Sequence, residues 1–225
     1  MKLKRFEFGL ASADQNAVEV YARRSDGARF TKSFPPREDI LEMAELDFDS
    51  NPRTWARAEA PPESRGLSEV WTGQGTLYVS GESAITCHAL EEREINTILS
   101  VSKLKPDTRN EILSYLSRNP RARHVEAPIR DVLPRHQDAS SALNAEIALR
   151  TATSSLQEGE HLLVHCLMGI HRSVAIAAAT LVLAGHFATP RDAFIHIQAR
   201  RRVAGWAPDS VEWLLSIVSP IGAPT

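Results

Sequence analysis

Two residues suited to chemistry on an anion, Cys166 and Arg172, stand with five residues between them. The apolar run 162–165 before Cys166 predicts a strand, and the run 173–183 after Arg172 predicts a helix. A loop between a strand and a helix can converge its backbone N–H groups on one point, where the helix dipole adds positive charge. Because the Arg172 guanidinium can hold two oxygens of one anion, these residues predict a cradle for a tetrahedral oxyanion, with the Cys166 sulfur at its base.

The same arrangement favours ionisation of the Cys166 thiol. Cysteines at helix N-termini near cationic groups have pKa values of roughly 3.5–7.5, below the ~8.5 of a free thiol. Cys166 is therefore expected to be a nucleophile at neutral pH without a separate base. Gly169 fits a loop that approaches its ligand closely or needs a positive φ.

Phosphoryl transfer to sulfur also requires an acid for the leaving oxygen. Asp131 follows the predicted strand 124–129. If that strand is parallel to the strand before Cys166, both end at the same edge of the sheet, and Asp131 stands beside Cys166. Asp138, further along the same loop, is the competing candidate.

The segments that must position these residues alternate between β and α patterns from about residue 67. Such alternation predicts an α/β fold in which helices flank a mostly parallel central sheet, with ligands bound beyond the carboxyl ends of the strands. In the helix predicted over 139–157, Leu143, Ile147, Arg150 and Leu156 stand near helical spacing. Strands are predicted at 76–79, 97–101, 124–129 and 162–165, and helices at 83–94, 106–117, 139–157, 173–183, 190–201 and 209–218.

The first 65 residues have a different pattern. Three β-like runs, at 5–10, 18–24 and 28–34, precede a predicted short helix (about 37–46) and a connecting segment with two Pro-containing breaks. We therefore predict two parts: a small β-containing N-terminal accessory segment of uncertain fold (1–65) and an α/β domain (66–222).

Composition limits the function further. The 225 residues carry 26 Lys and Arg against 28 Asp and Glu, a net charge of −2, which argues against bulk nucleic-acid binding. Two cysteines do not make a disulfide scaffold or a thiolate-rich metal site, and Cys87 is expected to be a packed thiol. The most apolar run, 174–184, is far shorter than the ~20 residues of a membrane span, and no signal peptide is evident. A cytoplasmic protein without membrane association is expected, and its oligomeric state stays open.

Residues 165–173 match the pattern His-Cys-x-x-Gly-x-x-Arg-Ser/Thr. With 77–81, 98–101, 128–131 and 201–203, this pattern makes the stretch from about 67 to 219 resemble the dual-specificity branch of the cysteine-dependent protein tyrosine phosphatase superfamily. The resemblance implies that Cys166 forms a phosphocysteine intermediate, Arg172 stabilises the transition state, and Asp131 is first acid and then base. It also implies that Ser173 aids departure of the thiolate and that His165 orders the loop. The phosphate-binding loop would consist of Leu167, Met168, Gly169, Ile170, His171 and Arg172, with no metal or other cofactor.

The resemblance implies a phosphoprotein phosphatase, and the sequence bears on its specificity. No segment matches the phosphotyrosine-gripping loop of the larger tyrosine phosphatases, which favours a shallower pocket for phosphotyrosine and phosphoserine or phosphothreonine. His171 stands where relatives commonly have Ser or Gly, so it could widen the rim or point outward. Arg200, Arg201 and Arg202 could form a basic rim or a solvated surface. The alternatives are a phosphatase of a non-protein substrate (an RNA 5′-phosphate or a phospholipid) and a phosphate-binding pseudophosphatase.

Overall fold

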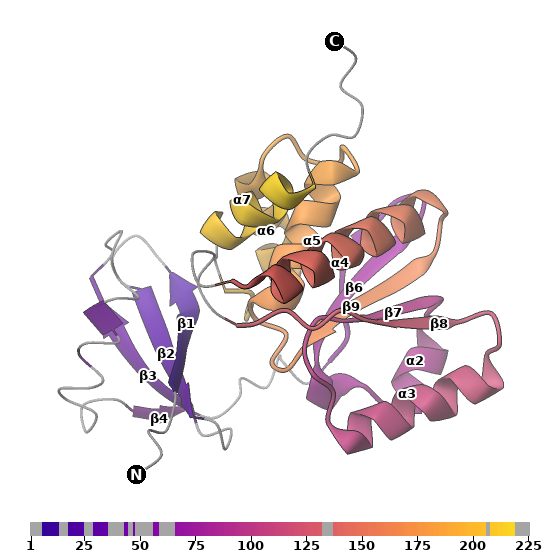
Figure 1. Ribbon diagram of the computed structural model, residues 1–225, viewed down its shortest axis with the longest axis horizontal. Coiled ribbons are helices and arrows are strands. Elements are labelled where there is room, and N and C mark those ends of the chain that lie inside the picture. Colours follow the sequence, from indigo (N-terminus) through magenta and orange to yellow (C-terminus); the bar gives the residue numbers. More distant parts are fainter. Residues whose placement is uncertain are drawn as a thin grey trace.

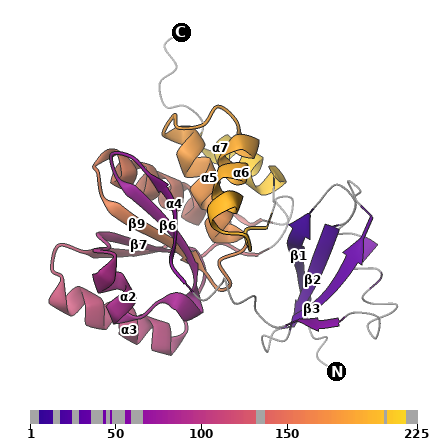
Figure 2. The same ribbon diagram turned by 180° about the vertical axis from the view of Figure 1, so that it is seen from behind.

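The computed structural model describes residues 6–13, 18–24, 29–35, 43–44, 47, 56–58, 66–131, 137–205 and 208–218. Its N-terminal part is an antiparallel sheet in the order β1-β2-β3-β4. The strands are β1 (Phe6–Ala13), β2 (Val18–Arg24), β3 (Arg29–Phe34) and β4 (Ala56–Ala58). This sheet stands apart from the rest of the fold in both views (Figures 1 and 2) and confirms the small β-containing extension. The helix predicted over 37–46 falls mostly outside the described residues.

The central sheet has five strands in the order β5-β6-β9-β7-β8. All its neighbouring pairs are parallel except β5 with β6, so the predicted mostly parallel sheet is confirmed. The antiparallel edge strand β5 was not predicted, because only one of its five residues is buried and the segment lacks an apolar run. The strands are β5 (Ser68–Thr72), β6 (Thr76–Gly81), β7 (Thr97–Ser100), β8 (Arg123–Glu126) and β9 (His161–Cys166).

Helices cover both faces of this sheet (Figure 1). One face carries α4 (Ala139–Gln157), α5 (Arg172–Leu183), α6 (Pro190–Arg200) and α7 (Pro208–Ile217). The other carries α2 (Cys87–Glu92) and α3 (Pro106–Arg118). Among the described helices, none combines the length and apolar composition that a bilayer crossing requires.

The helix predicted over 83–94 is wrong at its start. A short 3₁₀ turn, η3 (Glu82–Ala84), comes first, and α2 begins only at Cys87. Thr86 is extended and caps α2 by accepting a hydrogen bond from the Ala89 N–H (3.1 Å). The 3₁₀ turn ends at Ile85, which is already extended, and the Thr86 hydroxyl then opens α2 as its N-cap.

Each face of the sheet has its own buried core. Residues Leu162, Val164 and Cys166 of β9 belong to the core under α4 and α5, whereas Leu163 belongs to the core under α2 and α3. The alternation follows from the two-residue period of a strand. It therefore places the Cys166 and His165 side chains on opposite faces.

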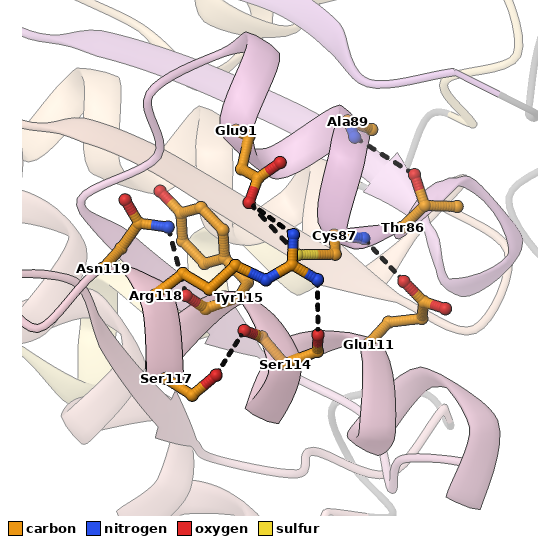
Figure 3. Close-up of polar contacts among 10 residues, drawn as sticks. All are labelled: Thr86, Cys87, Ala89, Glu91, Glu111, Ser114, Tyr115, Ser117, Arg118 and Asn119. Atoms are coloured by element: carbon orange, nitrogen blue, oxygen red, sulfur yellow. Dashed lines mark hydrogen bonds and ion pairs between the residues drawn. The ribbon is translucent and has the colours of Figure 1, made fainter.

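The second cysteine lies in the α2/α3 layer. The Cys87 N–H donates to Glu111 of α3 (2.6 Å), and Glu91 of α2 accepts from Arg118 of α3 (3.1 Å) (Figure 3). The Cys87 thiol is buried, free and 3.5 Å from a Glu91 carboxylate oxygen. These contacts join two helices, as expected for a packed thiol, and Cys87 belongs to the core on the face opposite that of Cys166.

The helix α4 matches its predicted bounds, but its spacing did not identify the buried face. Leu143 is 59% exposed and Ile147 39% exposed, whereas Leu149 is fully buried. Small residues, Ala145, Ala148 and Ala152, line the buried stripe and let α4 lie close to the sheet.

The two leucines of α4 make a matched pair for a stability test. Leu149→Ala removes fully buried methyl groups and should lower the free energy of unfolding by about 2–4 kcal/mol. Leu143→Ala removes exposed ones and should change it by less than ~0.5 kcal/mol. Urea unfolding followed by circular dichroism measures both. Equal losses of unfolding free energy in the two variants would contradict the burial of Leu149 and the exposure of Leu143.

Candidate active site

The thiol of Cys166 lies at the carboxyl end of β9, where the loop 167–171 begins. Its sulfur accepts a hydrogen bond from the Gly169 N–H (3.2 Å) and is 3.3 Å from the Ser173 hydroxyl. Cys166 is 2% exposed and Ser173 fully buried. The loop therefore folds around the sulfur, as its position between strand and helix predicted.

The carbonyls of this loop are held outward by three residues from two other segments. The Leu167 carbonyl accepts from the Glu82 N–H (3.1 Å), that of Gly169 from the Arg201 guanidinium (2.7 Å), and that of Ile170 from the Gly205 N–H (2.9 Å). In a trans peptide the N–H points opposite the C=O. The N–H groups of residues 168, 170 and 171 must then point to the inner side of the loop, where they make a site for an anion.

Glycines make this close packing possible. Gly169 has φ 67°, a conformation that favours glycine. A Cβ there would lie 2.4 Å from the Gly81 nitrogen at the end of β6, and a Cβ on Gly81 would lie 2.8 Å from the Met168 carbonyl oxygen. The predicted need for a positive φ and a close approach at Gly169 agrees with the geometry.

The electrostatic surroundings of Cys166 favour the thiolate. Burial alone raises the pKa of the thiol, but the Arg172 guanidinium and the Ser173 hydroxyl hydrogen bond lower it more, against a smaller raising by Asp131. The net pKa lies below that of an ordinary cysteine. This shift favours the thiolate, the form of the sulfur that acts as a nucleophile.

Arg172 and Asp131 face each other at the loop. Their side chains form an ion pair of 3.3 Å, each 13% exposed, and Arg172 also donates to the Ile129 carbonyl (3.1 Å). Asp138 instead caps α4 by accepting from the Ser141 N–H (2.8 Å), and it pairs with Arg130 at 3.3 Å. The hydrogen bonds from Ser141 are the largest cause of its lowered pKa. Of the two candidate acids, only Asp131 is described in contact with the anion-binding residues.

His165 lies next to Cys166 in sequence, but its ring occupies the other face of the sheet. It is fully buried and 2.6 Å from the Ser100 hydroxyl. Its pKa is lowered to about 3, chiefly by burial, so the ring is neutral. His171, at the start of α5, is half-buried and lines a pocket together with Asp131, Arg172 and Trp213.

Arg201 does not belong to a basic rim. It is 1% exposed, whereas its neighbours Arg200 and Arg202 are exposed. Besides the Gly169 carbonyl, it donates to the Ser68 hydroxyl (2.9 Å) and the Gly66 carbonyl (3.3 Å). Burial lowers the pKa of Arg201 to about 10, and the Cys166 charge opposes this shift, so Arg201 stays cationic beneath the loop. The sequence did not identify this residue, because a run of three arginines gives no sign of which one is buried.

Titration of the thiol tests the electrostatics. The rate of alkylation of Cys166 by iodoacetate should rise with a midpoint below the ~8.5 of a free thiol. Arg172→Met removes the main stabilising cation while burial remains, so the midpoint should move upward, and Ser173→Ala should move it less. Peptide mass spectrometry separates Cys166 from Cys87. A wild-type midpoint at or above the ordinary value would contradict the assignment.

Two adjacent arginines provide a test of the loop support. Arg201→Met frees the Gly169 carbonyl, so the loop loses its fixed shape, and hydrolysis of an aryl phosphate should slow roughly 10- to 100-fold. Arg200→Met, which removes an exposed cation of the same size, should stay within about twofold. Arg201→Met should also lower the free energy of unfolding, because buried groups that accept from Arg201 lose their donor, at about 1–3 kcal/mol for each group left unpaired. The rates are therefore compared at a temperature where circular dichroism shows both variants folded. Equal rates for the two variants would argue against the role of Arg201.

Solved structures with this fold include three phosphatase or phosphatase-like domains. Human DUSP28 is 20% identical over 67% of this chain and 94% of its own, with TM-score 0.52. A mouse putative dual specificity phosphatase complexed with zinc tungstate is 21% identical over 71% and 89%, with TM-score 0.53. Human tyrosine phosphatase-like serine/threonine/tyrosine-interacting protein is 22% identical over 68% and 95%, with TM-score 0.51.

The amino-acid sequence matches a model of a whole family, although it matches no individual curated protein. No curated protein matches the chain significantly. The sequence model of the family described as "Dual specificity phosphatase, catalytic domain" matches residues 77–217, more than half of the chain. These residues run from within β6 to the end of α7, and they contain the loop around Cys166. The chain therefore belongs to the dual specificity phosphatase catalytic domain family.

Proposed function

We propose that this protein is a metal-independent phosphatase that hydrolyses phosphate monoesters of proteins through a cysteinyl-phosphate intermediate on Cys166. The observation that carries the proposal is the sulfur at the centre of a loop whose amides turn inward, with Arg172 at its mouth. Phosphate is the oxyanion that this cradle fits best, because a tetrahedral dianion can accept from the amides and the guanidinium together.

In the first step the Cys166 thiolate attacks phosphorus. The S–P bond forms as the P–O bond to the leaving group breaks, and Asp131 gives its proton to the leaving oxygen. Binding of phosphate draws the Arg172 fork to the substrate, which releases Asp131 from its 3.3 Å ion pair. The freed carboxylate then takes up a proton from solvent before it acts as the acid. Arg172 and the loop amides stabilise the charge on the equatorial oxygens.

In the second step water attacks the phosphorus of the intermediate. Asp131, now a carboxylate, takes the proton from the water, and the S–P bond breaks to release inorganic phosphate and the thiolate. The Ser173 hydroxyl, 3.3 Å from the sulfur, stabilises the departing thiolate. His165 acts through the backbone, since its ring lies on the opposite face from the sulfur.

The proposed substrates are phosphoproteins. Phosphotyrosine is expected to be hydrolysed more efficiently than phosphoserine or phosphothreonine. The pocket beside the loop, lined by His171 and Trp213, would contact the residue that carries the phosphate. The named alternatives remain outcomes of the test: a phosphatase of RNA 5′-phosphates or phospholipids, and a phosphate-binding module. One structural neighbour is described as a tyrosine phosphatase-like serine/threonine/tyrosine-interacting protein, a name that fits a binding module. A cytoplasmic location stays a prediction from the sequence.

Aryl phosphate hydrolysis by matched carboxylate variants tests the mechanism. Asp131→Asn cannot supply the proton, so kcat should fall by roughly 100-fold or more, the usual contribution of general acid catalysis. Asp138→Asn should keep most of the activity, because it loses only part of a helix cap. A loss confined to Asp138→Asn would overturn the choice of acid, and activity in Cys166→Ser would overturn the nucleophile.

Substrate class is decided by comparing kcat/KM across phosphotyrosine, phosphoserine and phosphothreonine peptides, a 5′-phosphorylated RNA and phospholipid vesicles. The proposal expects the highest value for a phosphotyrosine peptide. Preference for the RNA or the lipid would replace it with the corresponding alternative. Phosphopeptide binding without turnover at any pH would indicate a pseudophosphatase.

A further inference from the structure

The chain that carries Asp131 to the site, residues 127–131, is called the acid segment below. It follows β8, the edge strand of the central sheet, and it is held on the side of β7 by backbone hydrogen bonds. The N–H groups of Ala127 and Ile129 donate to carbonyls at the end of β7 and just beyond it (2.9 and 3.1 Å). The Ile129 carbonyl accepts from Arg172 (3.1 Å). Alternate residues of the acid segment are therefore anchored to the sheet and to the anion-binding loop.

Side chains from the start of α4 bind the residues in between. The Asn144 amide donates to the Pro128 carbonyl (2.8 Å), and the Ser141 hydroxyl accepts from the Arg130 N–H (3.3 Å). Just before the helix, the Gln137 amide donates to the Arg130 carbonyl (3.0 Å). All backbone hydrogen-bonding groups of Pro128 and Arg130 thus have a partner, although no further strand lies outside β8 in this sheet.

The first turns of α4 are built to present these side chains. Asp138 caps the helix by accepting from the Ser141 N–H (2.8 Å), which fixes the first turn. Ser141 and Asn144 are three residues apart and so lie on one side of the helix. Ser141 is buried and Asn144 half-buried, so both side chains lie between the helix and the acid segment. The Arg130–Asp138 ion pair, in contrast, is half-exposed and adds little to this hold.

We propose that Asn144, assisted by Ser141, is a positioning residue for Asp131. This role rests on the proposed function of Asp131 as the general acid. When phosphate binds, Arg172 turns to the substrate and its ion pair with Asp131 can no longer hold the acid. The bonds from α4 involve no group that binds phosphate, so they persist while the proton is transferred. A general acid must stay within hydrogen-bond reach of the leaving oxygen, and a displacement of about 1 Å can cost much of its effect.

Dependence on the leaving group reads the position of the acid. A weakly basic leaving group such as 2,4-dinitrophenolate departs without a proton, whereas phenolate needs one. The ratio kcat/KM covers the steps up to departure of this group. Asn144→Ala should lower kcat/KM for phenyl phosphate roughly fivefold, the scale of one net hydrogen bond, and leave that for 2,4-dinitrophenyl phosphate within about twofold. Loss of fold or of the anion site would lower both values together.

Conservative variants and a neighbour complete the series. Asn144→Gln keeps an amide donor and should recover part of the phenyl phosphate activity. Asn144→Asp has the same shape but offers only acceptors at neutral pH, so it should behave like Asn144→Ala. Leu143→Ala is the matched control, because this side chain is exposed on the same helix, and both ratios should stay at wild-type values.

A double variant shows whether Asn144 acts through Asp131. If it does, Asn144→Ala combined with Asp131→Asn should lose no more phenyl phosphate activity than Asp131→Asn alone. Additive losses, or equal losses with both substrates in Asn144→Ala, would overturn the positioning role. A leaving-group-dependent loss in Asp131→Asn without one in Asn144→Ala would also overturn it, and would leave the proposed function intact. An Asp131→Asn variant insensitive to the leaving group would instead refute the choice of acid, and the inference with it.

Discussion

The planar peptide bond is the constraint on which the rest of this structure depends. An anion site made of backbone amides exists only if the carbonyls on the same peptides are occupied elsewhere. Here they are occupied by groups distant in sequence: the Glu82 N–H after β6, the Arg201 side chain after α6 and the Gly205 N–H. The sheet and the helix layer therefore position Cys166 and also hold the loop with its carbonyls outward and its N–H groups inward.

Side chains of β9 alternate between the two faces of the sheet, so Cys166 and His165 contact different cores. Cys166 points into the core under α4 and α5, where Arg172 and Ser173 of α5 lower its pKa. His165 points into the opposite core, where it meets Ser100. Two adjacent residues thus connect the loop to both layers of the fold. A substitution in either core can therefore shift the sulfur, because one peptide bond joins the two residues.

The sequence predicted what local patterns determine and missed what depends on tertiary contacts. The strand, loop and helix around Cys166 were predicted because hydrophobic runs and residue spacing encode them directly. The burial of Arg201 and the hydrogen bond from Asn144 to Pro128 were not, since both depend on segments that meet only after folding. The exposed Leu143 shows the same limit: helical spacing places residues on one stripe but does not say which stripe faces the sheet.

The central claim is that Cys166 becomes phosphorylated during turnover. Mixing the protein with an aryl phosphate, stopping the reaction by rapid denaturation and mapping peptides by mass spectrometry measures this directly. The account predicts a phosphate adduct on the peptide that contains Cys166, none on the peptide with Cys87, and none in Cys166→Ser. Turnover by the wild type with no adduct on Cys166 at any quench time, together with retained turnover in Cys166→Ser, would contradict it.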